Sequence, residues 1–123
     1  IMLYNGISVP PLIRVDRIIS AFENDIDEAK IEEYTKVMQR EMLSHDFPPI
    51  MGYPFIITED DIGRILLTGE EIEEEHIGCL LWCVTDGHHR SISAINANLP
   101  HFEVKLDYST ITSDEDLNQF SNK

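Results

Sequence analysis

Basic residues are scarce in this chain. Its 123 residues include nine Lys or Arg against 23 Asp or Glu, which gives a formal net charge of −14 at pH 7. The nine cations are spread along the chain, whereas proteins that bind a nucleic-acid backbone carry a clustered basic patch. The charge therefore argues against binding to duplex DNA. It would also repel a nucleotide, unless a cation such as Mg²⁺ accompanied the phosphates.

Long apolar runs are lacking as well, and there are only two cysteines. No segment reaches the roughly 18 apolar residues of a membrane-spanning helix, and the first residues lack the basic and apolar regions of a signal peptide. Cys79 and Cys83 both lie in what reads as one strand, with α-carbons about 13 Å apart, too far for a disulfide. These absences predict a reduced, cytoplasmic protein that does not associate with membranes.

Hydrophobic periodicity predicts a mixed set of helices and strands. Apolar residues recur at helical spacing from about residue 27 to 44, and strict alternation over 102–107 predicts a half-buried strand. Two prolines, Pro10 and Pro11, suit an edge strand or the beginning of a strand. The remaining patterns predict one short strand within residues 12–19, a strand at 50–57 that Gly52 and Pro54 divide, and a short helix at 59–67 capped by Thr58.

These elements predict the class α+β, a small mixed sheet with two or three helices. We expect one domain over residues 1–108 and a polar tail over 109–123. No internal repeat is recognised. The acidic run Glu70–His76 is interpreted as a solvated hairpin tip or exposed helical turn, or else as a mobile acidic lid or a surface for a protein partner.

The stretch with the clearest chemical pattern is CLLWCVTDGHHRSISAINAN, residues 79–98. An apolar strand ends at the turn dipeptide Asp86-Gly87, and helical spacing begins directly afterwards. His88, His89 and Arg90 would then lie on the first turn of a helix. Backbone N–H groups at a helix N-terminus bind phosphate, and an arginine and two imidazoles add further donors for the same anion.

This stretch resembles the ParB/sulfiredoxin-like superfamily, whose signature is a strand, a Gly-x-(His/Arg)-Arg turn and a helix that holds nucleotide phosphates. Two further segments match in the correct order. Arg14-Val15-Asp16-Arg17-Ile18 resembles the opening strand of the family, and Phe47-Pro48-Pro49-Ile50 resembles the segment before the next strand. The resemblance covers roughly residues 7–108, apart from about 25 residues at 53–78. It implies the ParB/sulfiredoxin-like fold.

Departures from the family pattern narrow the expected activity. Sulfiredoxin has its catalytic cysteine where this chain has His88, so sulfinic-acid repair is not expected. Chromosome-partitioning ParB proteins continue into a helix-turn-helix domain, so partitioning is not expected either. Asp86-Gly87-His88-His89-Arg90 looks closest to the free serine kinase branch. The resemblance thus implies an enzyme that binds ATP or CTP with Mg²⁺ and hydrolyses the nucleotide or transfers its terminal phosphate to a small hydroxyl-bearing acceptor.

Each residue of the motif has an expected role and an ordinary structural alternative. The expected phosphate ligands are Gly87, His88, His89, Arg90 and Ser91, and the expected catalytic residues are Asp86, His89 and Glu32. Asp86 would also hold the metal ion. Arg90 could instead form a salt bridge, and Asp86 could cap the helix. The general base is open among Glu28, Glu32, Glu41 and Asp46.

Three alternatives remain beside the nucleotide enzyme. The first is a ParB-like nuclease acting on DNA. The second is a non-enzymatic acidic interaction protein, such as a phage or plasmid accessory factor, that binds its partner through Glu70–His76. The third is a zinc site, although the spacing of its candidate ligands matches no standard zinc motif; these are His76, Cys79, Cys83, His88 and His89. The acceptor, the nucleotide base and the oligomeric state stay open.

Overall fold

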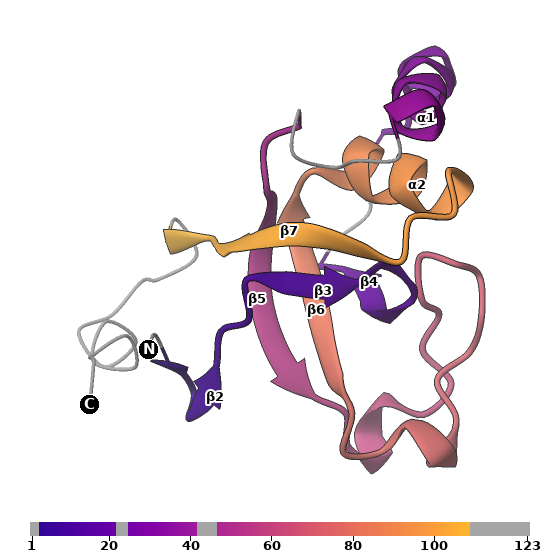
Figure 1. Cartoon of the computed structure of the whole chain (residues 1–123). Coiled ribbons are helices and arrows are strands. Elements are labelled where there is room, and N and C mark those ends of the chain that lie inside the picture. Colours follow the sequence, from indigo (N-terminus) through magenta and orange to yellow (C-terminus); the bar gives the residue numbers. More distant parts are fainter. Residues whose placement is uncertain (1–2, 22–24, 42–46, 109–123) are drawn as a thin grey trace.

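The computed structural model describes residues 3–21, 25–41 and 47–108. The predicted α+β class is confirmed, because a five-stranded mixed sheet carries two helices at one end (Figure 1). A separate two-stranded hairpin pairs β1 (Leu3–Tyr4) with β2 (Ile7–Ser8). The strands of the main sheet, in spatial order, are β3 (Leu12–Arg14), β7 (His101–Leu106), β5 (Ile50–Ile56), β6 (Leu80–Asp86) and β4 (Ile18–Ser20).

The two edge strands of the sheet are neighbours in the chain. β3 pairs antiparallel with β7 and β4 pairs parallel with β6, so the prediction of one strand within 12–19 is wrong. A 3₁₀ turn, η1 (Val15–Arg17), joins the two strands. Because four residue steps span at most roughly 14 Å, the sheet curls until its two edges lie close together. Pro10 and Pro11 do precede an edge strand, as predicted.

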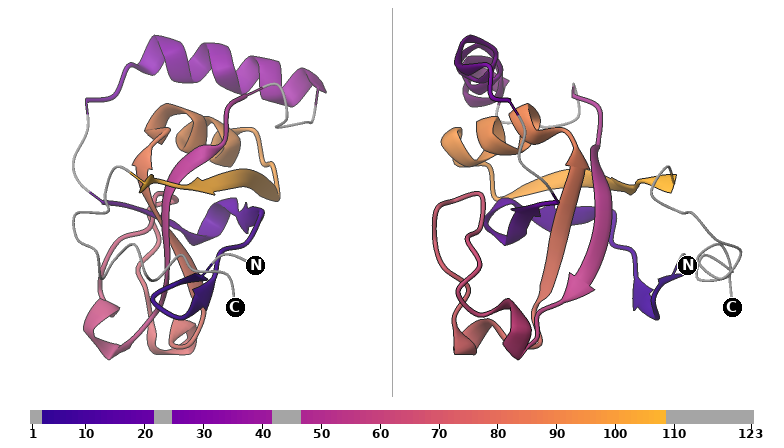
Figure 2. Two further views of the ribbon diagram at one scale, coloured as in Figure 1. Left: turned by 90° about the vertical axis from the view of Figure 1, so that its left-hand side faces the viewer. Right: turned by 180° about the vertical axis from the view of Figure 1, so that it is seen from behind.

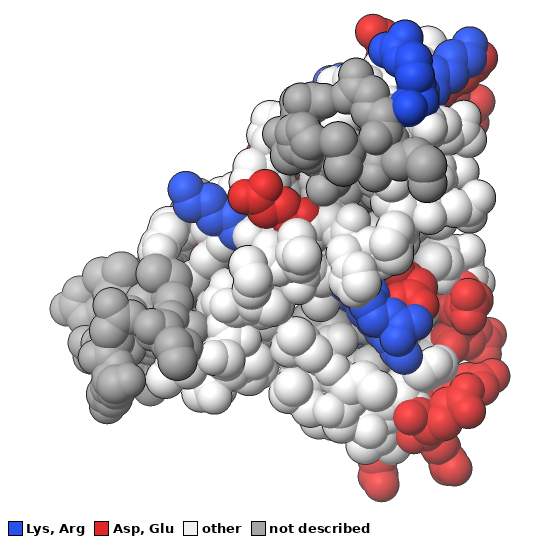
Figure 3. Space-filling view, in the orientation of Figure 1, with Lys and Arg blue, Asp and Glu red and all other residues white. Residues whose placement is uncertain are grey.

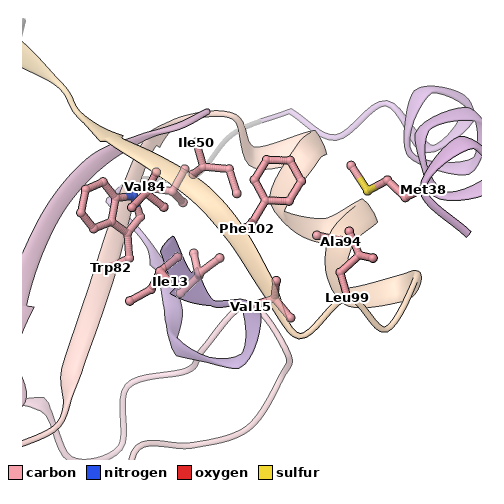
Figure 4. Close-up of a cluster of buried hydrophobic side chains, with 11 residues drawn as sticks. Ile13, Val15, Met38, Ile50, Trp82, Val84, Ala94, Leu99 and Phe102 are labelled. Atoms are coloured by element: carbon pink, nitrogen blue, oxygen red, sulfur yellow. The ribbon is translucent and has the colours of Figure 1, made fainter. Parts of the chain in front are cut away.

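The core lies on both faces of β6. Residues Leu81 to Val84 are all at most 2% exposed, and successive side chains of a strand point to opposite faces. On one face Trp82 and Val84 join a cluster that reaches both helices, and Figure 4 shows Met38 pointing from the first helix toward Ala94 and Leu99. On the other face a smaller cluster gathers Ile19, Ile57, Leu66, Ile72, Leu81 and Cys83.

The helices form two layers above the end of the sheet. α2 (His88–Asn96) lies against the strands, and α1 (Glu28–Glu41) crosses it on the side away from the sheet (Figure 2). Ile31 and Met38 are the buried part of the predicted apolar stripe of α1. The buried Ser93 hydroxyl donates to the carbonyl of Ile31, 3.2 Å away, which joins the two helices. Neither of the described helices combines the length and apolar character needed to cross a membrane.

The segment between β5 and β6 differs most from expectation. The predicted helix at 59–67 is wrong, because only η2 (Glu59–Asp61) is helical and Ile62 and Ile65 are 42% and 53% exposed. A second 3₁₀ turn, η3 (Glu74–His76), lies in the acidic run, in agreement with the interpretation as an exposed helical turn. The strand at 50–57 is one continuous strand with an irregularity at Met51 and Gly52. Cys79 precedes β6 and is not part of it.

Two predictions fall outside the described residues. These are the polar tail at 109–123 and the part of the first helix beyond residue 41. The alternation at 102–107 is confirmed, since Phe102, Val104 and Leu106 of β7 are buried and the residues between them are exposed.

Candidate functional site

The predicted turn joins β6 to α2. Gly87 is the N-cap residue of α2 and has φ +108°, a conformation that favours glycine. A β-carbon at this position would lie 2.8 Å from Nη2 of Arg90, so the absence of a side chain lets the guanidinium fold back over the turn. Gly87 has no side chain that could cap the first turn of α2. In general, the leading backbone N–H groups of a helix have no partner within the helix.

Arg90 holds the turn against the segment before β5. Its Nη1 donates to the carbonyl oxygens of Pro48 and Pro49, at 3.0 and 3.1 Å, and its Nη2 lies 3.6 Å from Oδ2 of Asp86. The side chain of Arg90 is only 14% exposed, whereas that of Asp86 is 76% exposed. Most of the guanidinium is thus occupied inside the protein, and only its Nε and Nη2 edge is left to contact a ligand.

Two of the predicted phosphate ligands have their side chains inside the fold. Nε2 of His88 lies 2.7 Å from the hydroxyl of Ser20 at the end of β4, and His88 is 3% exposed. Burial lowers the pKa of His88, and the neighbouring His89 lowers it further. Ser91 is fully buried and donates to the carbonyl of Gly87 at 2.8 Å. Both side chains fasten the first turn of α2, and neither is presented to a ligand.

His89 connects the first turns of the two helices. Its Nε2 accepts a hydrogen bond from the backbone N–H of Asp27, 3.0 Å away, just before α1. The Asp27 carboxylate in turn accepts from the N–H of Lys30 at 3.2 Å. An imidazole that accepts at Nε2 carries its proton at Nδ1 when it is neutral. His89 can therefore offer a donor to a ligand, while its lone pair is already used.

A cavity of about 380 Å³ opens at this turn. One wall is the first part of α1, with Lys30 and Tyr34, and the opposite wall is the turn itself. The Lys30 ammonium lies 5.6 Å from the centre of the Tyr34 ring. The lining residues are Lys30, Tyr34, Phe47, Pro48, Asp86, Gly87, His88, His89 and Arg90. We call this the corner cavity; among the described residues that line it, Lys30 and Arg90 carry positive charge and Asp86 carries negative charge.

The structure does not bring the other predicted acid to the corner cavity. Glu32 lies on a different side of α1, pairs with Lys36 at 3.1 Å and lines a separate cavity of about 530 Å³ between the helices. Glu28 lines that same separate cavity. The side chain of Glu41 and the whole of Asp46 lie outside the described residues.

The predicted metal sites receive little support from the arrangement. Within residues 3–21, 25–41 and 47–108, no three His, Cys, Asp or Glu side chains gather around a point where they could share an ion. The alternative zinc site is therefore not formed by the described residues. Asp86 could supply a single ligand, which suits Mg²⁺ bound mainly through phosphate oxygens better than a metal ion held by protein alone.

Sequence reasoning missed Lys30, Tyr34, Ser20 and Asp27. Each lies far from the motif in the chain, and each contacts the corner only because α1 and β4 pack beside α2. A local signal exists for Asp27 alone, since an acidic residue before a helix is a typical cap. No protein-family model and no curated protein sequence matches this chain.

Proposed function

We propose that the protein binds the phosphate chain of a magnesium-nucleotide, ATP or CTP, in the corner cavity. The observation that carries the proposal is the convergence of positive groups from two helices on one hollow. The N-terminal amides of α2 and the Nδ1 side of His89 lie across from the Lys30 ammonium. Helix amides and a lysine are common phosphate ligands. The resemblance of residues 86–90 to a phosphate-binding turn supports the same conclusion independently.

Arg90 has a different role from the bidentate clasp that the motif suggests. Because its Nη1 is bonded to two proline carbonyls, Arg90 fixes the wall formed by residues 47–49 and contributes its remaining edge to the ligand. Lys30 is the cation with the most freedom to move toward a phosphate, since it is exposed and carried on the opposite wall. Lys30 is therefore the residue whose loss tests binding most directly.

Magnesium fits the donors at this position. Mg²⁺ commonly binds through one or two carboxylates together with substrate phosphates, and Asp86 is exposed at the rim of the corner cavity. Asp86 would hold the ion, and the ion would supply charge neutralisation for the leaving phosphate. It would also reduce the repulsion between a nucleotide and a chain of net charge −14.

For turnover, we propose either hydrolysis of the nucleotide or transfer of its terminal phosphate to a small hydroxyl-bearing acceptor. His89 would donate a hydrogen bond through Nδ1, which suits stabilisation of charge on a phosphate better than removal of a proton. Asp86 is the carboxylate available to orient a water or hydroxyl. The same cavity in a nuclease would have to admit a polyanion against the charge of the whole chain, so we rank that alternative lower.

The test is calorimetric titration with ATP and with CTP, with and without Mg²⁺. Replacing Lys30 by Gln removes one positive contact, and we expect the dissociation constant to rise about tenfold, as for loss of one charged hydrogen bond. Lys36→Gln is the matched control, because Lys36 is on the same helix but lines the other cavity, and we expect less than about a twofold change.

Phosphate release under the same conditions tests the enzymatic part. Asp86→Asn should raise the Mg²⁺ concentration that phosphate release requires. It should leave the folded spectrum intact, because Asp86 is exposed. If the wild-type protein bound neither nucleotide at millimolar concentration, or if Lys36→Gln weakened binding as much as Lys30→Gln, the corner cavity would not be a nucleotide site.

A further inference from the structure

The segment between β5 and β6 contains an internal repeat that inspection of the sequence alone did not reveal. Ile57-Thr58-Glu59-Asp60-Asp61-Ile62-Gly63 and Ile72-Glu73-Glu74-Glu75-His76-Ile77-Gly78 are offset by 15 residues and share four of seven residues. Each copy contains one 3₁₀ turn, η2 or η3. Each turn is followed by an exposed isoleucine and by a glycine of positive φ, +91° for Gly63 and +88° for Gly78.

The two copies are fastened by the same local bonds. In the first, the backbone N–H of Thr58 donates to the Asp61 carboxylate at 2.8 Å. In the second, the N–H of Glu73 donates to Nδ1 of His76, also at 2.8 Å. The φ and ψ angles of the N-cap residues agree closely, −119° and 177° for Thr58 against −115° and 171° for Glu73. The copies thus have one conformation, although their capping residues differ.

The bonds between the copies are reciprocal, which relates them by an approximate twofold axis. The N–H of Gly63 donates to the carbonyl of Ile72, and the N–H of Gly78 donates to the carbonyl of Ile57, both at 2.9 Å. Ile57 and Ile72 are each 1% exposed and anchor the pair to the smaller core cluster. We call residues 57–79 the double turn. Its two copies are hydrogen-bonded to each other, and their surface residues also come in matched pairs.

Two of these matched pairs of surface residues line a cleft. Glu59 and Ile62 from the first copy face Glu74 and Ile77 from the second around a hollow of about 660 Å³. Ile62 and Ile77 are 42% and 41% exposed. Two apolar side chains and two carboxylates thus line one hollow between the copies. An apolar surface of this kind is a common feature of protein interaction sites.

The surroundings of the cleft are strongly acidic. Residues 57–79 carry eight carboxylates and one arginine, and that arginine, Arg64, is bound to Asp61 at 3.0 Å. Figure 3 shows the acidic side chains gathered along the part of the molecule that these residues occupy in Figure 1. A second copy of this chain would bring like charges together, and so would its residues 109–123, which hold three carboxylates and one lysine.

From these observations we infer that the cleft of the double turn binds a segment of another protein in which basic and apolar residues alternate. The apolar residues of the segment would cover Ile62 and Ile77, and its lysines or arginines would approach Glu59 and Glu74. The surrounding carboxylates would speed the encounter of the two proteins. The inference does not rest on nucleotide binding, because the described residues that line the corner cavity and those that line the cleft are different.

Fluorescence polarisation with a labelled peptide of alternating Lys and Leu, at about 0.15 M salt, tests the inference. We expect binding to the wild-type protein and about a tenfold rise in dissociation constant for Glu59→Gln/Glu74→Gln and for Ile62→Ser/Ile77→Ser. None of these side chains caps a turn, since the capping residues are Thr58, Asp61, Glu73 and His76, so both variants should keep the wild-type circular dichroism.

Glu33→Gln/Glu103→Gln is the matched control, because it removes the same charge from exposed positions elsewhere, and it should change binding less than about twofold. An equal loss in this control, or equal binding of a Lys-Ser peptide of the same charge, would show attraction to the general field and overturn the cleft as a site. Absence of any binding would overturn it too, as would a dimer in sedimentation that Ile62→Ser/Ile77→Ser dissociates.

Discussion

Charged and polar side chains are enclosed at one end of β6 and exposed at the other. At the carboxyl end, the imidazoles and the guanidinium of residues 88–90 are drawn into the protein and bonded to Ser20, to the N–H of Asp27 and to two proline carbonyls. At the amino end, the double turn leaves most of its carboxylates exposed on one surface. Both ends are rich in polar side chains, but those at the carboxyl end are hydrogen-bonded within the protein, whereas most at the amino end face solvent.

This difference indicates how each end affects the stability of the folded protein. Polar groups that bond within the protein join separate elements, and removal of one leaves its buried partners unsatisfied. Exposed like charges repel one another and lower the stability of the folded state slightly. The polar groups of the corner therefore stabilise the fold, whereas in the double turn Asp61 bonds to Thr58 and Arg64 while most of the other carboxylates are exposed to solvent.

The largest effect is expected from loss of Arg90, whose side chain is only 14% exposed. Arg90→Ala leaves the carbonyls of Pro48 and Pro49 without their donor, and we expect the free energy of unfolding to fall by about 3 kcal/mol. Urea denaturation measures the change. Arg14→Ala is the control, because Arg14 is 57% exposed and bonded only locally to Asp16 at 2.6 Å, and it should cost less than about 0.5 kcal/mol. Equal losses would contradict the contrast between enclosed and exposed cations.

A smaller effect is expected in the pH dependence of stability. Burial lowers the pKa of His88 below its ordinary value of 6.5, His89 lowers it further and Asp86 opposes the shift. As pH falls below about 6.5, His88 is therefore protonated in the unfolded chain while it stays neutral in the folded protein. The stability that depends on neutral His88 is complete above this pH and is lost below it.

His88→Gln tests that dependence. The variant should be less stable than the wild type near neutral pH, because it disturbs the contact with Ser20, but its stability should decline less steeply between about pH 7 and pH 5. His101→Gln, which removes an exposed histidine from β7, should leave the slope unchanged. Parallel slopes for the wild type and His88→Gln would mean that His88 does not stay neutral in the folded protein.

The sequence predicted elements well where periodicity and turn chemistry agree. The strand, glycine turn and helix around Gly87 are in place, and so is the alternating strand of Phe102, Val104 and Leu106. Prediction failed at residues 12–19, where a short turn sends the chain from one edge of a curled sheet to the other. It failed again at 59–67, where a helical spacing of isoleucines is overridden by the glycine turns of the repeat.

The candidate site was predicted only in its local part. Residues 86–90 do line one cavity, because a strand, a glycine and a helix fix their relative positions. Which side chains face a ligand could not be predicted, since this depends on what packs from elsewhere. The side chain of His88 is hydrogen-bonded to Ser20, and that of Arg90 to the carbonyls of residues 48 and 49. Lys30, which lines the same cavity, belongs to a helix more than fifty residues earlier in the chain.

The smallest effect, and the one opposite in sign, is expected at the acidic end. Glu70 and Glu71 are exposed residues of the segment that joins the two repeats, so Glu70→Gln/Glu71→Gln should relieve repulsion and raise the free energy of unfolding by about 0.5 kcal/mol at low salt. At about 1 M salt, where charges are screened within roughly 3 Å, the gain should vanish. Glu32→Gln provides the contrast, because that carboxylate pairs with Lys36 at 3.1 Å and its loss should lower stability by about 0.3 kcal/mol. If the double variant were instead less stable than the wild type at low salt, the carboxylates of the double turn would be serving the fold, and the case for keeping them for a partner would fail.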